Sequence, residues 1–332
     1  MLTLMVKMTV LASGSRGNGT VVSSSRTRIL VDAGMSCREI CKRMAISGED
    51  PRTLDAILIT HEHQDHVQGL AVTARKLGIP VYFTESTHRA WMRWVTPRKR
   101  MTYADWLAAR QAAQEPSVAA SNPEGDDREP FDHSNTQSRR VWDTDQEERE
   151  ELAPNPATET KTDPCALPAV EYFSSGEAFC VGDIAVTPFT IPHDAADPVG
   201  FIFEAEGVRI GLATDLGYMP PNAKRHLKKC DVLMLESNHD LDMLRDGPYP
   251  WSVKQRVMSR VGHLSNLAAA EFLEGEYDGG AAYVILAHLS ENNNLPELAR
   301  VAAERALDGR MSLLANKLLL ATQDRPLESI VL

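Results

Sequence analysis

Residues 59–70 read ITHEHQDHVQGL, and they complete the apolar run that begins at residue 56. Within six positions the stretch holds His61, His63, Asp65 and His66, in the pattern H-x-H-x-D-H. In a loop that leaves a strand, alternate side chains can converge on one point while Asp65 and His66 turn towards a second. Imidazole and carboxylate groups together suit zinc, manganese or iron. A lone histidine is usually an ordinary polar residue, but four such side chains in one loop predict a metal site.

One loop cannot fill the coordination spheres of two metal ions, so further ligands are expected at the ends of other strands. Three candidates follow apolar runs: His193 comes after FTIP, Asp215 after RIGLAT and His288 after AYVILA. Each of them alone would be a weak candidate. With the loop they form a set of histidines and aspartates that can face one shared cleft.

The apolar pattern predicts short strands that alternate with helices. Strands are expected in VKMTVLAS, TVVSS, RILVDAG, DAILIT and PVYFT, and again in the runs EYFSSGEAFCVGDIAVTPFTIPH, PVGFIFEAEGVRIGLATD, CDVLMLESN and AYVILAH. A helix is expected in GLAVTARKLG, ending at Gly78, and another after ENNN. In each half, strand meanders precede βα units. This order predicts an α/β fold with two sheets packed face to face and helices outside, a four-layer αββα sandwich.

Residues 108–166 differ from the rest of the chain, because Pro, Glu, Asp, Ser and Thr dominate there and large apolar residues follow no period. Such a stretch buries too little surface to offset its ordering entropy. We predict a disordered or weakly ordered insertion within a single domain spanning residues 1–332. A linker between two domains is the alternative, but the candidate ligands come from both halves.

The net charge of −11 is unevenly distributed, since residues 105–163 carry −9 and the remainder only −2. The acidic total therefore does not exclude a polyanionic substrate. No window holds 18 consecutive apolar residues, so no membrane span is expected. The N-terminal stretch is interpreted as a strand rather than a signal peptide, and the five scattered cysteines as free thiols. Together these features predict a cytoplasmic protein.

The ordered set HEHQDH, IPH, ATD and LAH resembles the metallo-β-lactamase fold superfamily of αββα hydrolases with a two-metal site. The resemblance implies that one metal is held by His61, His63 and His193, the other by Asp65, His66 and His288, with Asp215 bridging. The metals would be zinc or manganese. A hydroxide bridging two such cations is a potent nucleophile near neutral pH. Histidine at position 63 favours hydrolysis, because the di-iron redox branch has glutamate there.

Three further stretches narrow the substrate. The turn SGSRGNGT includes Ser13 and Asn18 and lets backbone N–H groups approach a ligand or the metal loop; a tight hairpin is the alternative. LESNHD places Glu236 at the end of a strand. GHLSN includes His263, Ser265 and Asn266; His263 is suited to hold a phosphate oxygen or protonate a leaving group, although it could be a plain loop residue. Ser265 is a candidate N-cap. Apart from His263, these residues are predicted to support the metal ligands or to bind substrate: Ser13, Asn18, Glu236, Ser265 and Asn266.

These stretches together resemble the WalJ (also YycJ) family, over about residues 7–105 and 168–320. The resemblance implies a 5′-to-3′ double-strand DNA exonuclease. We predict Asp65 and His263 as its catalytic residues. The acidic insertion departs from the family's compact form. We expect it to lie free on the surface rather than over the cleft.

The sequence itself supports a nucleic-acid partner only in part. Lys254, Arg256 and Arg260 lie on a predicted helix that leads to GHLSN, although each could belong to a solvated helix face. Trp91 and Trp94 could stack on bases, but packing in the core is the default expectation. Asp32, at the end of RILVDAG, is predicted either to orient a metal-bound histidine or to cap the next helix.

The sequence thus predicts a metal-dependent phosphodiester hydrolase acting on DNA. A small-molecule phosphodiesterase, thioesterase or lactonase on the same metals is the first alternative. A non-catalytic binding protein is the second, although degenerate members of the fold typically lose ligands. The oligomeric state, the polarity of digestion and the physiological metal do not follow from the sequence.

Overall fold

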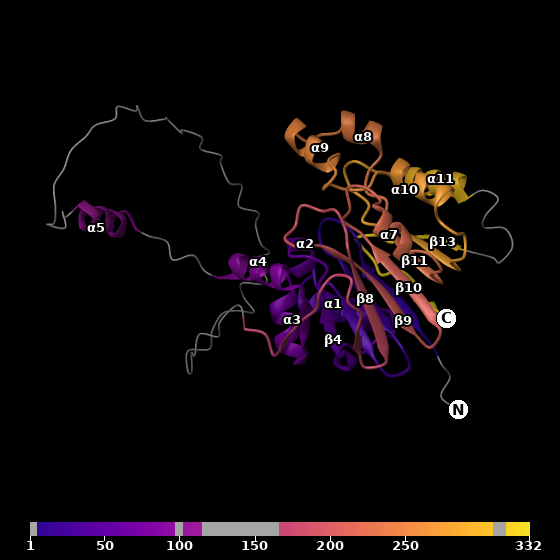
Figure 1. Ribbon diagram of the computed structural model, residues 1–332, viewed down its shortest axis with the longest axis horizontal. Helices are drawn as coiled ribbons and strands as arrows, with labels where there is room; N and C mark the ends of the chain where they lie inside the picture. The colour runs from indigo at the N-terminus through magenta and orange to yellow at the C-terminus, as the bar shows by residue number, and fades with distance from the viewer. Residues whose placement is uncertain (1–4, 97–101, 115–165, 308–316) are drawn as a thin grey trace. The chain divides into compact units, whose positions relative to one another are not determined.

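A computed structural model describes residues 5–96, 102–114, 166–307 and 317–332 of the chain (Figure 1). Two seven-stranded sheets form its centre. The first sheet has the order β14-β1-β2-β3-β4-β5-β6. Its strands are β1 (Lys7–Ala12), β2 (Gly19–Ser23), β3 (Arg28–Val31), β4 (Ala56–Leu58), β5 (Val81–Phe83), β6 (Val170–Tyr172) and β14 (Ile330–Val331).

The second sheet has the order β13-β12-β11-β10-β9-β8-β7. Its strands are β7 (Phe179–Val181), β8 (Ile184–Thr190), β9 (Val199–Ala205), β10 (Val208–Ala213), β11 (Val232–Glu236), β12 (Tyr283–Ala287) and β13 (Lys317–Leu320). In each sheet antiparallel hairpins come first and parallel strands follow: β3, β4, β5 and β6 in one, and β10, β11, β12 and β13 in the other. The predicted order of meanders and βα units is therefore observed.

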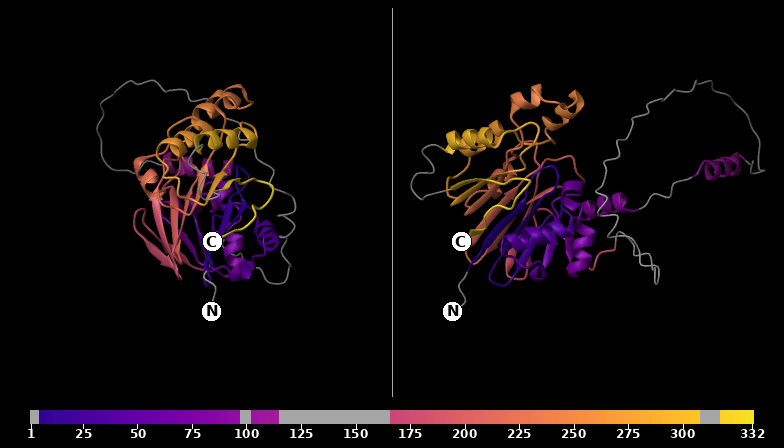
Figure 2. Two further views of the ribbon diagram at one scale, coloured as in Figure 1. Left: turned by 90° about the vertical axis from the view of Figure 1, so that its right-hand side faces the viewer. Right: turned by 180° about the vertical axis from the view of Figure 1, so that it is seen from behind.

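Helices cover the outer face of each sheet (Figures 1 and 2). Beside the first sheet lie α1 (Cys37–Ile46), the 3-10 turn η1 (Pro51–Thr53), α2 (Gln64–Val67), α3 (Leu70–Leu77) and α4 (Glu85–Val95). The second half contributes α7 (Pro221–His226), α8 (Leu241–Asp246), α9 (Trp251–Val257), α10 (Asn266–Gly275) and α11 (Pro296–Leu307). The predicted four-layer αββα sandwich is confirmed.

The buried apolar side chains form three separate clusters, because successive residues of a strand point to opposite faces of its sheet. In β11, Val232 and Met234 face the first sheet, whereas Leu233 and Leu235 pack with the helices of the second half. Successive side chains of a strand point to opposite faces, so a strand covered on both sides must be apolar throughout. A third cluster joins the first sheet to α1, α3 and α4, where Trp91 is buried.

Helix boundaries follow the expected capping chemistry. Gly78 ends α3 in the left-handed conformation, with φ of 70°, as the sequence predicts. Ser265 is the N-cap of α10 and accepts a hydrogen bond from the Ala268 N–H. The default expectation for the two α4 tryptophans is wrong for Trp94, which is 73% exposed. Three residues advance a helix by about 300°, so Trp94 is turned by about 60° from the direction of Trp91. This rotation, one residue before the end of α4, takes Trp94 off the buried face.

Contacts divide the chain into one unit of residues 1–96 and 164–332 and a second of residues 97–163. In the second unit the described residues include helix α5 (Tyr103–Gln114). The first residues of the predicted insertion are therefore helical, and most of the remainder lies outside the described residues. Among the described helices, none is both long and apolar enough to cross a membrane.

Asp183, in the turn between β7 and β8, ties the second sheet to the β2–β3 turn of the first. Its carboxylate accepts hydrogen bonds from Ser24 Oγ (2.7 Å) and Arg26 Nε (3.2 Å), and its N–H donates to Thr27 Oγ1. Burial acts to raise the pKa of Asp183, but hydrogen bonds from Thr27, Ser24 and Arg26 outweigh it and lower the pKa to about 2.

We expect Asp183→Asn to lower the free energy of unfolding by about 1–2 kcal/mol at pH 7. Because the pKa of Asp183 is lower in the folded protein than in the unfolded chain, its ionised carboxylate stabilises the fold at pH values above the unfolded-state pKa of about 3.9. This stabilisation is lost as the pH falls towards 2. Urea denaturation at pH 7 and pH 3 should therefore show a smaller difference between the two proteins at the lower pH. Asp324→Asn, at a side chain 80% exposed, is the control. A difference independent of pH would contradict the assignment.

Candidate metal centre

Most of the candidate ligands lie where parallel strands of both sheets end, whereas His193 follows β8, which is antiparallel to its neighbours. The loop carrying His61 follows β4, which is parallel to β3, and His288 follows β12, which is parallel to β11. Asp215 follows β10, the next parallel strand. Parallel strands present their carboxyl ends at one edge of a sheet, and packing two sheets face to face brings two such edges together. Residues far apart in the sequence can therefore converge.

Three side chains next to these strand ends have an unusual backbone conformation. Asp32, Asp215 and His288 have φ values of 60°, 63° and 55°. Left-handed backbone is uncommon for residues other than glycine, although Asp and His tolerate it better than most. A residue in this conformation turns the chain sharply as the strand ends. The surrounding core holds this conformation, in which Asp32 reaches His66 and Asp215 reaches His288.

The described residues bring the predicted ligands into overlapping groups, within each of which one ligand atom per residue lies within 4.8 Å of the others. The groups are His61, His63 and His193; Asp65, His66 and His288; His61, His66 and Asp215; and Asp215, Glu236, His263 and His288. The first two are the sets that the family resemblance implies. Asp215 shares a group with members of both, which is the position of a bridging carboxylate.

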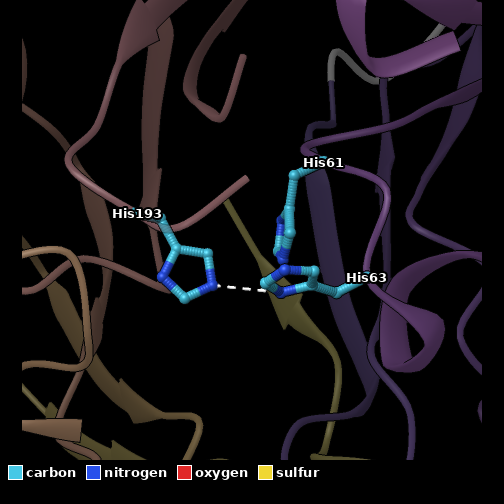
Figure 3. Close-up of side chains that lie close together, drawn as sticks. All are labelled: His61, His63 and His193. Atoms are coloured by element: carbon cyan, nitrogen blue, oxygen red, sulfur yellow. Dashed lines mark hydrogen bonds between the residues drawn. The ribbon is translucent and has the colours of Figure 1, made fainter. Parts of the chain in front are cut away.

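The first group joins the two halves of the chain (Figure 3). His61 and His63 come from the loop after β4, and His193 approaches from the second half. The His193 Nε2 and His63 Nδ1 atoms are 3.2 Å apart. His61 is fully buried and His193 is 6% exposed. Three imidazoles facing one point provide the nitrogen ligands that zinc and manganese accept.

The second group is richer in carboxylate. Asp65 Oδ2 lies 3.5 Å from His66 Nε2 and 3.5 Å from His288 Nε2. Asp215 Oδ2 lies 3.4 Å from His66 Nε2, and Asp215 Oδ1 lies 3.3 Å from His288 Nδ1. Two carboxylates among the imidazoles offset the positive charge that cations would bring into a buried site.

Buried atoms without hydrogen bonds show that this centre fits metal ions. Among the described residues, His61 Nε2, Asp215 Oδ2 and His288 Nε2 are buried and have no hydrogen-bond partner. An unsatisfied buried polar atom costs about 1–3 kcal/mol, so native proteins rarely keep several together. Metal coordination would satisfy all three, because each is a ligand atom that faces the shared centre.

Hydrogen bonds on the outer side of each ring decide which nitrogen faces inward. His66 Nδ1 donates to Asp32 Oδ2 (2.8 Å), His193 Nδ1 to the Gly262 carbonyl (3.1 Å) and His288 Nδ1 to Glu236 Oε1 (2.9 Å). In each of these rings Nε2 is left for a metal. His63 is reversed, since its Nε2 donates to the Asp194 carbonyl (3.2 Å) and its Nδ1 faces inward. Such partners fix the tautomer and strengthen the ligand.

The protonation of His61 and Asp215 suits metal binding, whereas that of His66 and His288 does not. Burial acts to lower the pKa of His66 and His288, but Asp215 and the other neighbouring carboxylates outweigh it and raise the pKa of both rings well above the ordinary value, so both must lose a proton when a metal binds. Burial, together with the neighbouring His66, lowers the pKa of His61 well below its ordinary value, which keeps that ring neutral. Burial acts to raise the pKa of Asp215, but the imidazoles of His288 and His66 outweigh it and hold the pKa well below the usual range. A neutral imidazole and an ionised carboxylate are the forms that coordinate a cation.

Glu236 links a metal ligand to His263. Its Oε1 accepts from His288 Nδ1 (2.9 Å) and from His263 Nδ1 (2.8 Å), and its Oε2 accepts from the N–H groups of Leu216 and Leu264. The side chain is fully buried. Burial acts to raise the pKa of Glu236, but the hydrogen-bonded His263 and His288 outweigh it and lower the pKa to about 2. His263 is thereby held beside the centre, with its side chain 23% exposed.

The glycine-rich turn between β1 and β2 is a hairpin and also contacts the metal loop. Asn18 Nδ2 lies 3.3 Å from Asp65 Oδ2 and 3.1 Å from His66 Nε2. Ser13 Oγ accepts from the His288 N–H (2.8 Å). The Asn18 N–H itself donates to the Asp65 carbonyl (2.7 Å). In the neighbouring loop after β3, a Cβ at Gly34 would lie 1.7 Å from the same carbonyl oxygen, so only glycine lets the metal loop approach this closely. The turn is therefore both a tight hairpin and a point of close approach to the metal loop.

Ser265 and Asn266 stand apart from the ligand groups. Ser265 caps α10, and Asn266 belongs to a buried polar network in which it bonds Ser237 Oγ and Asn294. The network ties the loop after β11 to the loop after β12. These two residues therefore support the loops and do not face the metal centre directly.

Sequence reasoning missed two residues of the centre. Thr60 Oγ1 lies within 3.2 Å of both Asp32 oxygens, of His61 Nδ1 and of His66 Nδ1, so one hydroxyl connects the two ligand groups. Asp194 bonds His63 through its carbonyl, and its buried carboxylate Oδ1 lies 3.5 Å from His193 Nε2. Both are sequence neighbours of a predicted ligand, and that adjacency is the only signal the sequence offers.

The Metallo-beta-lactamase superfamily profile matches residues 13–273 of the chain. The chain belongs to this superfamily. It is 32% identical over 302 residues to the exodeoxyribonuclease YycJ of Bacillus anthracis, covering 90% of this chain and 88% of the relative. It is 30% identical to the exodeoxyribonuclease WalJ of Streptococcus pneumoniae, covering 89% and 86%. The WalJ/YycJ family predicted from the motifs is confirmed, and the protein is a metal-dependent hydrolase of this superfamily.

Solved structures support the same fold. The metallo-beta-lactamase fold protein YhfI from Bacillus subtilis aligns with a TM-score of 0.56 at 15% identity, over 98% of this chain and 99% of that one. A diphosphatase of the PhnP family aligns with a TM-score of 0.55 at 17% identity, over 99% and 98%. At these identities the comparison establishes the architecture and says nothing of substrate.

Asp32 orients His66, whereas the N-cap of α1 is Ser36. We expect Asp32→Asn to weaken metal binding by roughly 10- to 100-fold, because the amide cannot hold the His66 ring as a carboxylate does. Competition with a chromophoric chelator measures the affinity. Ser36→Ala is the matched control: it should lower stability by about 1 kcal/mol while metal affinity is kept. Equal metal affinity in wild type and Asp32→Asn would refute the role given to Asp32.

Proposed function

We propose that the protein is a two-metal phosphodiester hydrolase that digests double-stranded DNA from the 5′ end. The observation that carries this proposal is the buried ligand cluster with an adjoining, partly exposed His263. The relatives named exodeoxyribonuclease direct the choice of substrate to DNA. A location in the cytoplasm stays a prediction.

In this proposal His61, His63 and His193 would hold one zinc or manganese ion, and Asp65, His66 and His288 would hold the other. Asp215, which shares a ligand group with members of both sets, would be their common ligand. Two divalent cations at such a centre activate water as a nucleophile and polarise the phosphoryl oxygens. Asp65 is partly exposed, with 22% of its side chain accessible, so its carboxylate can also orient the attacking water.

His263 is proposed as the proton donor to the leaving oxygen. Glu236 Oε1 accepts a hydrogen bond from His263 Nδ1, so Nε2 is the nitrogen that can give a proton to substrate. Asn18, whose Nδ2 lies beside Asp65 and His66, keeps the second group in place against the glycine-rich turn.

Digestion of 5′-phosphorylated duplex DNA in the presence of manganese tests the function. We expect wild type to release nucleotides from the 5′ end and Asp65→Ala to lose turnover, because the second ligand group loses its partly exposed carboxylate. Circular dichroism melting should show that the variant remains folded. Gel analysis of end-labelled substrate resolves the polarity.

Parallel assays with bis(p-nitrophenyl) phosphate, thioesters and lactones separate the alternatives. Turnover of one of these without release of nucleotides would favour a small-molecule hydrolase and contradict the proposal. Absence of turnover on every substrate would favour the non-catalytic binding protein.

Removing the proton donor should have a distinct signature. We expect His263→Ala to reduce kcat on DNA by about 10²- to 10⁴-fold. The loss should be much smaller on DNA in which the scissile leaving oxygen is replaced by sulfur, because a thiolate leaves without protonation. Equal losses on the two substrates would show that His263 is not a proton donor.

A further inference from the structure

Beside the first ligand group, Asp194 holds an arginine in a fixed position. Arg256, on α9, donates from Nε to Asp194 Oδ2. The other carboxylate oxygen, Asp194 Oδ1, lies 3.5 Å from His193 Nε2, the nitrogen that faces the first metal position. The guanidinium is therefore separated from a ligand atom by a single carboxylate.

Asp194 is itself rigidly placed. Its N–H donates to the Val261 carbonyl (3.0 Å), and its own carbonyl accepts from His63 Nε2 (3.2 Å). Burial acts to raise the pKa of Asp194, but the Arg256 hydrogen bond outweighs it and holds the pKa below its ordinary value. A carboxylate anchored to the ligand loop thus fixes the direction of the guanidinium.

Arg256 keeps binding capacity towards solvent. The guanidinium has five N–H donors in a planar fork, and the bond to Asp194 uses the Nε donor. The side chain is 63% exposed, so the terminal N–H groups are open to a ligand. Two adjacent terminal nitrogens match two oxygens of a phosphate.

The other two basic residues near Arg256, Lys254 and Arg260, contact other groups. Lys254 is 8% exposed, and its Nζ donates to the Arg245 carbonyl (2.6 Å). The Arg260 guanidinium lies over the Tyr218 ring, 4.2 Å from its centroid. Of the three, Arg256 is the one bonded to a carboxylate at the metal centre.

We infer that Arg256, positioned by Asp194, forms a subsite for a second phosphate of the DNA strand, next to the one being cleaved. The inference rests on the proposed function and adds a substrate contact to it. A strand bound with its scissile phosphate at the metals places a neighbouring phosphodiester at the rim, where a cation fixed at one distance from the metals can bind it. Arg256 is then a binding residue and Asp194 a positioning residue.

The test compares a polymeric substrate with one that has a single phosphate. We expect Arg256→Gln to raise KM for duplex DNA by roughly 10- to 100-fold, because a charge-assisted contact is lost. The fall in kcat/KM on DNA should exceed the fall on bis(p-nitrophenyl) phosphate at least tenfold, since that substrate has no second phosphate. Arg260→Gln is the matched control and should leave the ratio of the two activities as in wild type. Equal falls on both substrates for Arg256→Gln would overturn the inference.

Binding measured without turnover separates this inference from the function. In an Asp65→Asn background, fluorescence anisotropy with labelled duplex gives the dissociation constant over a range of salt concentrations. Adding Arg256→Gln should weaken binding and reduce the slope of log affinity against log salt by about 0.9, the value for one phosphate contact. An unchanged slope, or no binding of duplex by the Asp65→Asn protein, would overturn the subsite. Binding without digestion by the wild type would overturn the proposed function alone.

Discussion

The structure depends on hydrogen bonds that hold the outer nitrogen of each ligand imidazole, which for His61 is a contact with Thr60 Oγ1. Asp32, Glu236 and the Gly262 carbonyl occupy the Nδ1 side of three rings, and the Asp194 carbonyl occupies the Nε2 side of His63. The remaining nitrogens must then face one another in a buried space. Without metal this arrangement is costly, because polar atoms such as His61 Nε2 have no hydrogen-bond partner among the described residues. Metal binding and the stability of this edge of the sandwich are therefore coupled.

The sandwich makes such convergence possible. The first ligand group needs both sheets, because His61 follows β4 of the first sheet and His193 follows β8 of the second. The core between the sheets fixes their separation, and the sharp turns at Asp32, Asp215 and His288 direct side chains inward. Close packing leaves little freedom for either sheet to shift, so the distances between ligands are set by the apolar core.

Two carboxylates perform the same task beside the two ligand groups. Glu236 bonds His263, and Asp194 bonds Arg256, so each acidic residue beside the candidate metal centre holds one basic side chain at its edge. A net charge of −11 is therefore compatible with the phosphodiester substrate that we propose. Most of the excess negative charge belongs to residues 105–163, and the acidic groups at the centre are neutralised by their own partners.

The amino-acid sequence by itself determined the features that depend on near neighbours. The H-x-H-x-D-H spacing, the left-handed Gly78 and the Ser265 cap are local, and the alternation of apolar residues sufficed for the αββα class. Only the tertiary structure decided which nitrogen of each ring faces inward, that Thr60 joins two ligand groups and that Trp94 is exposed. The ring orientations depend on partners from other segments, such as Asp32 for His66 and Asp194 for His63. The Thr60 contacts and the exposure of Trp94 depend on how a loop and a helix end pack in space, which periodicity along the chain does not encode.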